Sequence, residues 1–245
     1  MQLEGISFRG RTGELAVSNV SFSVPTGCLF GLIGPGASGK SVLLKLMAGL
    51  LRPSAGIVTL GGQKISHLPE LDLQVAQKQI GMLFQNNALF DHWTVFDNIA
   101  FPLKRLTQLS PSEISDRVHE RLRAVSMVGF GDRMPASLSG GQKKRIGVAR
   151  ATVTQAPYTL YDEPAAGLDP VTSQKIFELL REEQLKSKST VVMVSSDIDR
   201  LVTVTDRIGM MVRGELVFEG TTHESLHTEH PYMNQFMHGL LEGPL

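Results

Sequence analysis

The first third of the chain arranges hydrophobic and polar positions in short segments that predict β-strands. We expect strands over residues 3–8, 16–24, 28–34, 56–62 and 80–85. The third segment, CLFGLIG, is a continuous apolar run, which is typical of a strand buried on both faces of a sheet. A glycine-rich loop follows it, and residues 41–51 then carry apolar side chains at helical spacing.

The pattern changes to helical spacing between residues 86 and 154, and strands return after it. Helices are predicted over residues 94–106, 111–125 and 140–153. Further strands are predicted over 156–162 and 189–195, and a hairpin over 207–220 turns near Arg213 and Gly214. A helix begins at Asp169 and Pro170, a capping residue followed by proline, and the tail from Thr221 is helical.

Strands and helices therefore alternate on both sides of a helical stretch, which favours an α/β fold. We expect a mostly parallel sheet with an antiparallel β flank and an inserted helical subdomain. In this prediction residues 1–85 and 155–245 form the core and residues 86–154 form the helical subdomain. A chain of 245 residues is long enough to bury the core of this single domain.

Composition and charge narrow the class of protein. Lys plus Arg and Asp plus Glu each number 24, so no global positive field favours nucleic acid as a partner. The single cysteine, Cys28, excludes an internal disulfide, fits a reducing compartment and is expected to be buried. No stretch approaches the roughly 18 apolar residues of a membrane helix, and we expect no signal peptide. If the protein works at a membrane, another subunit must hold it there.

Residues 34–41 fit the pattern G-x-x-x-x-G-K-[ST], directly after a predicted buried strand and before a predicted helix. The segment consists of Gly34, Pro35, Gly36, Ala37, Ser38, Gly39, Lys40 and Ser41. Its glycines let backbone N–H groups curl around phosphate oxygens, and the helix N-terminus adds positive potential. In this pattern Lys40 reaches the β- and γ-phosphates and the Ser41 hydroxyl binds Mg²⁺. The context favours a P-loop nucleotide site over an ordinary glycine turn.

Two acidic residues, Asp162 and Glu163, end the predicted strand over 156–162. Ligand sites gather at the carboxyl ends of parallel strands. We therefore expect Asp162 to hold Mg²⁺ through water and Glu163 to act as the general base toward an attacking water. A solvated pair of acids is the alternative, and the phosphate loop favours the catalytic interpretation.

The segment LSGGQ, residues 138–142, opens the predicted helix over 140–153. Its polar turn, Ser139, Gly140, Gly141 and Gln142, forms a second anion cradle at a helix N-terminus. Here the sequence resembles the ATPase subunit of ABC transporters, in which LSGGQ is the family signature. The resemblance covers essentially the whole chain. It implies a homodimer that sandwiches two ATP molecules, each between the phosphate loop of one subunit and the LSGGQ of the other.

The same resemblance implies roles for two further segments. Gln85, at the end of a predicted strand, matches the family glutamine that touches Mg²⁺ and senses the membrane subunit. Residues 166–169, AGLD, match the loop that links the two ATP sites across the dimer.

The chain departs from the family at Ser196. In ABC ATPases the strand that here ends VMVSSD delivers a histidine before the aspartate, where it contacts the γ-phosphate and helps position the attacking water. Here that position is Ser196, and Asp197 is retained. Serine donates one hydrogen bond but is shorter and carries no charge. We therefore expect slower hydrolysis with ATP binding largely spared, unless Ser195 or a water compensates.

A second departure concerns the adenine base. The family usually stacks adenine on an aromatic residue shortly after the first strand, but here Arg9, Gly10 and Arg11 follow Phe8. An arginine can stack on a base instead. We expect Phe8 to belong to the core, and the sequence does not single out the stacking residue.

The segments ALF and TVFDNIAFPL and the tail QFMHGLLEGP resemble the ATPase of the Mla-type phospholipid transporters. This resemblance implies an integral-membrane permease as partner, an Mce-domain lipid-binding protein and a small regulatory subunit. It places the chain in the cytoplasm, peripherally on the inner membrane. An importer ATPase for another small solute, a slow nucleotide switch and a soluble ABC-type protein acting on DNA or ribosomes are the alternatives.

An aromatic and apolar cluster follows Gln85 and includes Leu89. We expect Phe90 and Trp93 to line a groove for a permease helix, and Val95 and Phe96 to lie inside the helical subdomain. The alternative is that the whole cluster forms the core of that subdomain.

Overall fold

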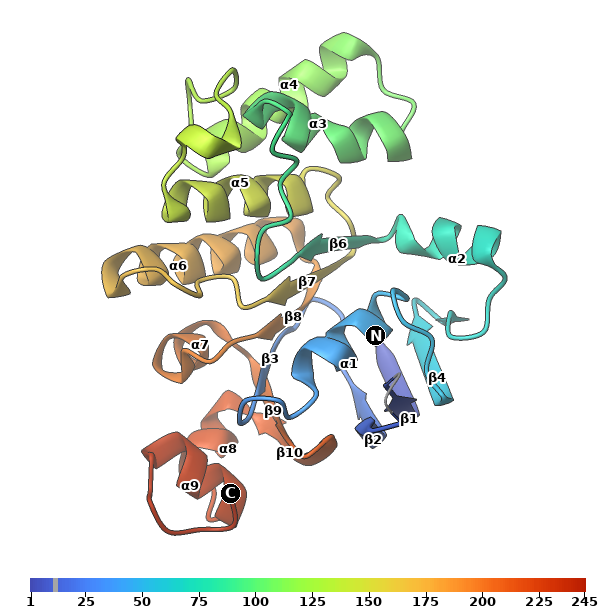
Figure 1. Ribbon diagram of the computed structural model, residues 1–245, viewed down its shortest axis with the longest axis vertical. Coiled ribbons are helices and arrows are strands. Elements are labelled where there is room, and N and C mark those ends of the chain that lie inside the picture. Colours follow the sequence, from blue (N-terminus) through green and yellow to red (C-terminus); the bar gives the residue numbers. More distant parts are fainter. Residues whose placement is uncertain (11–12) are drawn as a thin grey trace.

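The computed structural model describes residues 1–10 and 13–245 and contains two β-sheets with helices around them (Figure 1). The larger sheet has the strand order β10-β9-β3-β8-β7-β6. Its strands are β3 (Leu29–Ile33), β6 (Ile80–Leu83), β7 (Tyr158–Asp162), β8 (Thr190–Val194), β9 (Arg207–Val212) and β10 (Glu215–Thr221). Every neighbouring pair is parallel except β9 and β10, which form the predicted antiparallel hairpin. The predicted mostly parallel sheet is therefore confirmed.

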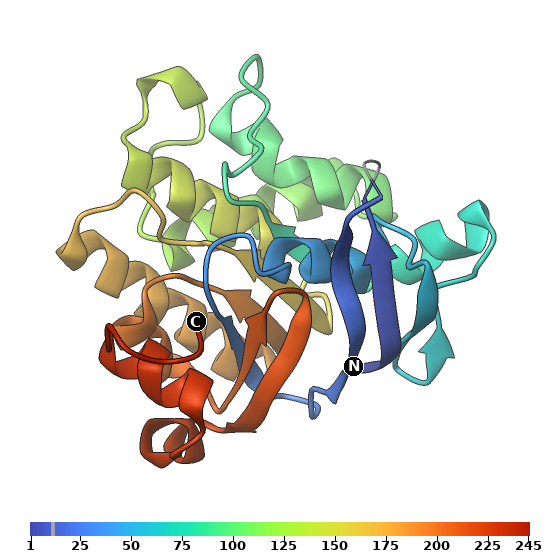
Figure 2. The same ribbon diagram turned by 60° about the horizontal axis from the view of Figure 1, so that its bottom comes forward.

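The second sheet forms the antiparallel flank and has the strand order β2-β1-β4-β5. Its strands are β1 (Gln2–Arg9), β2 (Leu15–Ser23), β4 (Ala55–Leu60) and β5 (Gln63–Lys64). All three strand pairs are antiparallel. Figure 2 shows β1 and β2 beside α1 (Lys40–Met47), and the inward side chains Val17, Val20 and Phe22 share a buried cluster with that helix. Alternating exposure along β2 explains the partial alternation in its sequence.

Three helices form a group at one end of the molecule, next to β6, β7 and the long helix α6 (Pro170–Ser187) (Figure 1). They are α3 (Val95–Leu106), α4 (Pro111–Ala124) and α5 (Gly140–Thr152). The tail helices α8 (Thr222–His227) and α9 (Pro231–His238) lie at the opposite end (Figure 1). Within the described residues, no helix has both the length and the apolar character that crossing a membrane requires.

The larger sheet separates two hydrophobic clusters, and its central strands supply side chains to both. In β3, Leu29 and Ile33 join one cluster whereas Phe30 and Leu32 join the other, as expected for alternating faces of a strand. All five residues of β3 are buried, which explains the continuous apolar run. Cys28, just before this strand, is buried as expected, and burial raises the pKa of its thiol to about 11.

The short helices α2 (Glu70–Gln77) and α7 (Ile198–Val204) and the two-residue strand β5 were not anticipated from the sequence. α2 buries only Leu73 and Ala76, so its apolar signal is weak. α7 buries only Leu201 and Val204 and follows the polar end of β8.

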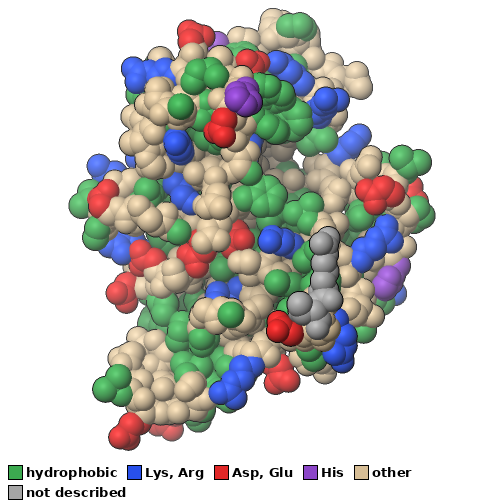
Figure 3. Space-filling model, viewed as in Figure 1, with side chains coloured by type: hydrophobic (Ala, Val, Ile, Leu, Met, Phe, Trp, Pro, Cys, Tyr) green, Lys and Arg blue, Asp and Glu red, His purple; other side chains and the backbone are tan. Residues whose placement is uncertain are grey.

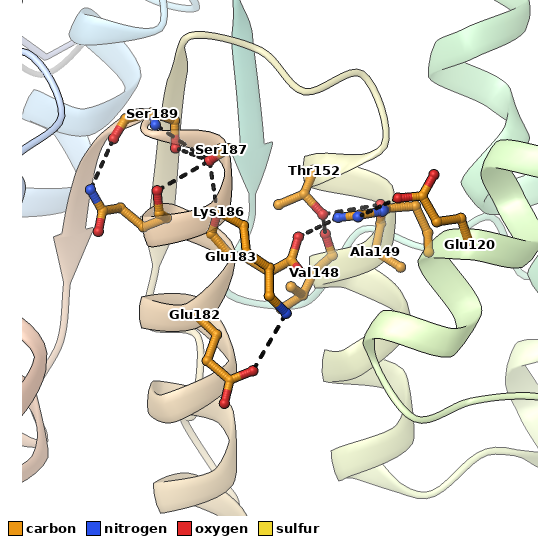
Figure 4. Close-up of polar contacts among 11 residues, drawn as sticks. Glu120, Val148, Ala149, Thr152, Glu182, Glu183, Lys186, Ser187 and Ser189 are labelled. Atoms are coloured by element: carbon orange, nitrogen blue, oxygen red, sulfur yellow. Dashed lines mark hydrogen bonds and ion pairs between the residues drawn. The ribbon is translucent and has the colours of Figure 1, made fainter.

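A buried ion pair connects the helical group to the core helix α6. Arg121 of α4 donates to Glu183 of α6, and their side chains are 12% and 6% exposed. Figure 4 shows Glu183 between α6 and the helices that carry Glu120 and Thr152. Arg121 also contacts Glu120, at 3.3 Å. The second oxygen of Glu183, Oε1, has no hydrogen-bond partner among the described residues. The contact between the two groups is therefore partly electrostatic.

Candidate functional site

The phosphate loop connects β3 to α1, and its backbone requires glycine at two positions. Gly34 has φ of 138°, and a Cβ atom there would lie 2.0 Å from the carbonyl oxygen of Met211. Gly39 precedes α1 with φ of 97°, and its Cβ would lie 2.3 Å from the carbonyl oxygen of Ala16. Backbone atoms of both sheets therefore lie so close to the loop that neither position can carry a side chain.

The ammonium group of Lys40 lies within the loop. Its Nζ donates to the carbonyl oxygens of Gly34 at 2.8 Å and Pro35 at 2.7 Å, and to Ser38 Oγ at 3.1 Å. Burial lowers the pKa of Lys40, and the nearby carboxylates of Glu163 and Asp162 act in the opposite direction. The lysine thus places its donors where the loop can hold a phosphate group.

Oxygen atoms of two of the predicted Mg²⁺ ligands, Ser41 and Asp162, lie in contact at the start of α1. Ser41 Oγ donates to Asp162 Oδ1 at 2.8 Å, and Asp162 is buried at the end of β7. Gln85 follows β6, the strand next to β7, and is exposed. A hydroxyl, a carboxylate and an amide oxygen are the hard donors that Mg²⁺ accepts, and one carboxylate beside phosphate oxygens is a usual arrangement. These residues therefore fit the predicted ion.

Glu163 and Ser196 lie at the ends of the neighbouring strands β7 and β8 and contact each other. Both the N–H and the hydroxyl of Ser196 donate to Glu163 Oε2, each at 3.1 Å. Glu163 has φ of 48°, a left-handed backbone that non-glycine residues rarely adopt, and its N–H donates to the Val194 carbonyl at 3.0 Å. Ser195 Oγ does not contact Glu163 in this way; it accepts from Asp197 N at 3.0 Å, within the turn that follows β8.

The LSGGQ segment forms the start of α5. Ser139 is the N-cap and exchanges hydrogen bonds with Gln142: Gln142 N donates to Ser139 Oγ, and Ser139 N donates to Gln142 Oε1. This capping box leaves the N–H groups of Gly140 and Gly141 at an open helix end. A cavity of about 440 Å³ lies between residues 139–142 and the AGLD loop. None of the described residues that line it belongs to the phosphate loop of the same chain.

Two basic residues of α5 hold the chain after β6, a contact that the sequence did not predict. Lys144 is buried and donates to the carbonyl oxygens of Gln85 and Glu163, the latter at 3.2 Å. Arg150 donates to the carbonyl oxygens of Asn87 and Ala88. The burial of Lys144 had one signal in the sequence: it lies four residues before the apolar Val148, so both side chains share one face of the helix, and Val148 is buried.

The aromatic cluster divides only partly as expected: Phe90 lines an apolar groove, whereas Trp93 lines a separate hollow with Asp97, Phe101, Lys104 and Arg105. Val95 is fully buried and Phe96 packs against the core, whereas Phe90 and Trp93 are 40% and 38% exposed. Phe90 lines a groove of about 420 Å³ together with Phe84, Ala88, Phe101, Pro102 and Leu106. Figure 3 shows hydrophobic side chains gathered on this face. Phe101 was not among the residues predicted for this groove, and its ring centroid lies 5.1 Å from that of Phe90.

Two of the residues near the predicted adenine site, Phe8 and Arg9, lie at the end of β1. Phe8 packs against the buried cluster of the antiparallel sheet, as expected for a core residue. Arg9 Nη1 donates to the Gly13 carbonyl at 3.3 Å. Arg11 lies outside the described residues.

Comparison with known proteins places these features in a family. Residues 17–166 match the family model described as ABC transporter. The chain is 37% identical over 227 residues to the probable ribonucleotide transport ATP-binding protein mkl of Mycobacterium leprae, covering 93% of this chain and 65% of that protein. It is 36% identical over 245 residues to TRIGALACTOSYLDIACYLGLYCEROL 3, chloroplastic, of Arabidopsis thaliana, covering 94% and 71%. The chain thus spans less than two thirds of the mycobacterial relative.

Solved structures give the same assignment. The ATP-binding cassette MJ0796, determined as a dimer in a post-hydrolysis state with ADP and Pi, superimposes with a TM-score of 0.85 at 29% identity. The match covers 90% of this chain and 98% of that one. Because the family model covers more than half of the chain, and because the fold and the motif order agree, this protein belongs to the ABC transporter family as an ATP-binding cassette.

Proposed function

We propose that this chain binds and hydrolyses ATP as the nucleotide-binding subunit of a membrane transporter. The observation that carries the proposal is the convergence of Lys40, the Ser41–Asp162 pair and the Glu163–Ser196 pair at the carboxyl ends of β3, β7 and β8. This edge is where parallel sheets place their ligands.

The residues would divide the work of hydrolysis as follows. Lys40 and the loop N–H groups hold the β- and γ-phosphates, and Glu163 takes a proton from the attacking water. The new P–O bond forms at the γ-phosphorus as the bond to the bridging oxygen breaks, which yields ADP and phosphate. Mg²⁺, held by Ser41, Gln85 and Asp162, would neutralise charge on the phosphates when bound.

A homodimer is proposed because the two anion cradles of one chain do not share a cavity. The LSGGQ turn and the AGLD loop of its own chain line one cavity, and no residue of the Lys40 loop is among the described residues that line it. Two facing copies would bring each cradle to the nucleotide of the partner. The dimeric state of the MJ0796 cassette supports this arrangement for a related fold.

The proposed partner in the membrane is a permease whose helix enters the groove beside Phe90. A mostly apolar groove on an exposed surface marks a binding site for another protein. Such a partner would hold the chain on the cytoplasmic face of the inner membrane. An Mce-domain lipid-binding protein and a small regulatory subunit are proposed from the Mla-type resemblance.

Phospholipid is the proposed cargo. The resemblance of residues 85–103 to Mla-type ATPases supports it, and the Arabidopsis relative is named after a galactolipid. Other relatives carry names of ribonucleotide transport and methionine import, so an importer of a small solute is the alternative cargo class. Counting the lipids that co-purify with the membrane partner would separate the two.

The test of the activity is steady-state ATP hydrolysis by the chain with its membrane partner, comparing wild type with Glu163→Gln. We expect measurable turnover in the wild type and a loss of at least about 100-fold in the variant, because the general base is removed. ATP binding, followed by calorimetry, should persist in both. Equal turnover in the two proteins would exclude Glu163 as the base. Binding without turnover in the wild type would instead favour a nucleotide switch.

A further inference from the structure

Lys144 is a buried cation whose hydrogen-bond partners are main-chain oxygens. It lies in the second turn of α5 and is 4% exposed. Its Nζ donates to the carbonyl oxygens of Gln85 and Glu163, and no carboxylate is among its described hydrogen-bond partners. Burying an ammonium group is costly unless its donors are satisfied, so a lysine here needs both contacts. Burial lowers its pKa, and the carboxylates of Glu163 and Asp162 oppose that effect.

The contact to Glu163 holds the proposed general base in an unusual conformation. The backbone of Glu163 is left-handed, with φ of 48°. Such a conformation is unfavourable in a non-glycine residue and persists when its surroundings fix it. Three contacts fix it here: Val194 accepts from its N–H, Lys144 donates to its carbonyl and Ser196 donates to its carboxylate. Removal of Lys144 would free the carbonyl end and let the carboxylate move.

The contact to Gln85 connects the same helix to a second part of the site. Six residues further along α5, Arg150 donates to the carbonyl oxygens of Asn87 and Ala88. Both of these residues have a left-handed backbone, with φ of 60° and 51°. α5 thus fixes the segment that carries the proposed Mg²⁺ ligand Gln85. Of these two basic residues, Lys144 alone also reaches Glu163, at the end of β7.

The geometry points to Lys144 as a positioning residue that couples α5, which starts with LSGGQ, to the catalytic carboxylate and to the Gln85 segment. This inference rests on the proposed function, because it assigns Lys144 a role in hydrolysis. A displacement of α5 would shift Glu163 and Gln85 together. Among the described residues, the hydrogen bonds of Lys144 reach neither the phosphate loop nor the carboxylate of Glu163.

The experiment replaces Lys144 by residues that keep different numbers of donors. Lys144→Met keeps the length of the side chain but no donor, and Lys144→Gln keeps an uncharged amide donor. Lys186→Met is the control, because Lys186 is a lysine of α6 that is 65% exposed and, among the described residues, forms an ion pair with Glu182 alone. Each variant is assayed as the full chain under the conditions that give wild-type turnover, with thermal unfolding measured alongside.

We expect kcat to fall about 10- to 100-fold in Lys144→Met, since small misplacements of catalytic groups cost that much, and less in Lys144→Gln. The Kd for ATP should stay within about 3-fold, because Lys40 and the phosphate loop are unchanged. Unchanged kcat in Lys144→Met would overturn the inference. So would losses of kcat that follow the melting temperature rather than the number of donors, because they would indicate a purely structural role.

The same measurements distinguish failure of the proposed ATP hydrolysis from failure of the Lys144 inference. If wild type and Glu163→Gln turn over ATP equally, the proposed base is wrong, and the role given to Lys144 falls with it. If wild type exceeds Glu163→Gln but equals Lys144→Met, only the Lys144 inference is overturned.

Discussion

At the scale of single residues, the hydrogen bonds of Ser196 change what its position can do. Both its N–H and its hydroxyl are directed at Glu163 Oε2. In this arrangement the serine orients the proposed base, whereas the family histidine contacts the γ-phosphate. A serine that donates to Glu163 has no second hydroxyl proton to offer a phosphate oxygen. The neighbouring Ser195 hydroxyl oxygen accepts from the N–H of Asp197.

We therefore expect Ser196→His to raise turnover. An imidazole adds a donor that can reach a phosphate oxygen, and one such contact in the transition state is worth on the order of 10²–10³ in rate. Because the serine–glutamate contact is lost in the exchange, we expect a net gain of roughly 10-fold or more at saturating ATP. Ser112→His, an exposed change on α4, is the control. Unchanged turnover in Ser196→His would show that the serine already supplies what hydrolysis needs.

At the scale of elements, the start of α3 fixes the aromatic side of the groove through one buried amide. Asn98 is fully buried, and its Oδ1 accepts from Phe90 N at 2.8 Å. Its Nδ2 lies within hydrogen-bond distance of the carbonyl oxygens of Phe90, Trp93 and Thr94. The loop that presents Phe90 and Trp93 is therefore attached to the first turn of the helix that follows it. These hydrogen bonds hold two large, partly exposed aromatic residues in place on the loop.

Replacing Asn98 by Leu should loosen this loop and destabilise the protein. The change leaves several buried backbone groups without partners, which costs about 2–4 kcal/mol in the free energy of unfolding. Urea unfolding measures that cost, with the exposed Asn234→Leu as a control expected within about 0.5 kcal/mol of wild type. Trp93 is the single tryptophan, so acrylamide quenching of its fluorescence reports the loop directly and should increase. Stability and quenching equal to wild type would contradict this role of Asn98.

At the scale of the whole molecule, the sequence predicted what depends on local pattern and missed what depends on register. The strand Leu29–Ile33 was predictable because burial on both faces requires a run of adjacent apolar residues. The phosphate loop was predictable because close backbone approach requires glycine at fixed positions. The contact of Ser196 with Glu163 was not, because it follows from the pairing of Asp162 with Val194 across β7 and β8. The role of Lys144 was hidden for the same reason, since its partners are distant carbonyl oxygens.

The attachment of the helical group to the core gives a prediction at this scale. Arg121 and Glu183 are both largely buried, so removing one partner leaves an uncompensated charge in a medium of low dielectric. Arg121→Met should lower the free energy of unfolding by about 3–5 kcal/mol, measured by urea denaturation.

A double variant separates the cost of a stranded charge from the value of the pair itself. Arg121→Met combined with Glu183→Met removes both charges, and replacing a buried pair by apolar residues is often close to neutral. We therefore expect the double variant to be more stable than Arg121→Met alone. The exposed pair of Lys186 and Glu182 is the comparison, and its removal should cost less than about 1 kcal/mol. A double variant less stable than Arg121→Met would contradict the stranded-charge explanation, and the difference between the double variant and wild type gives the net contribution of the pair.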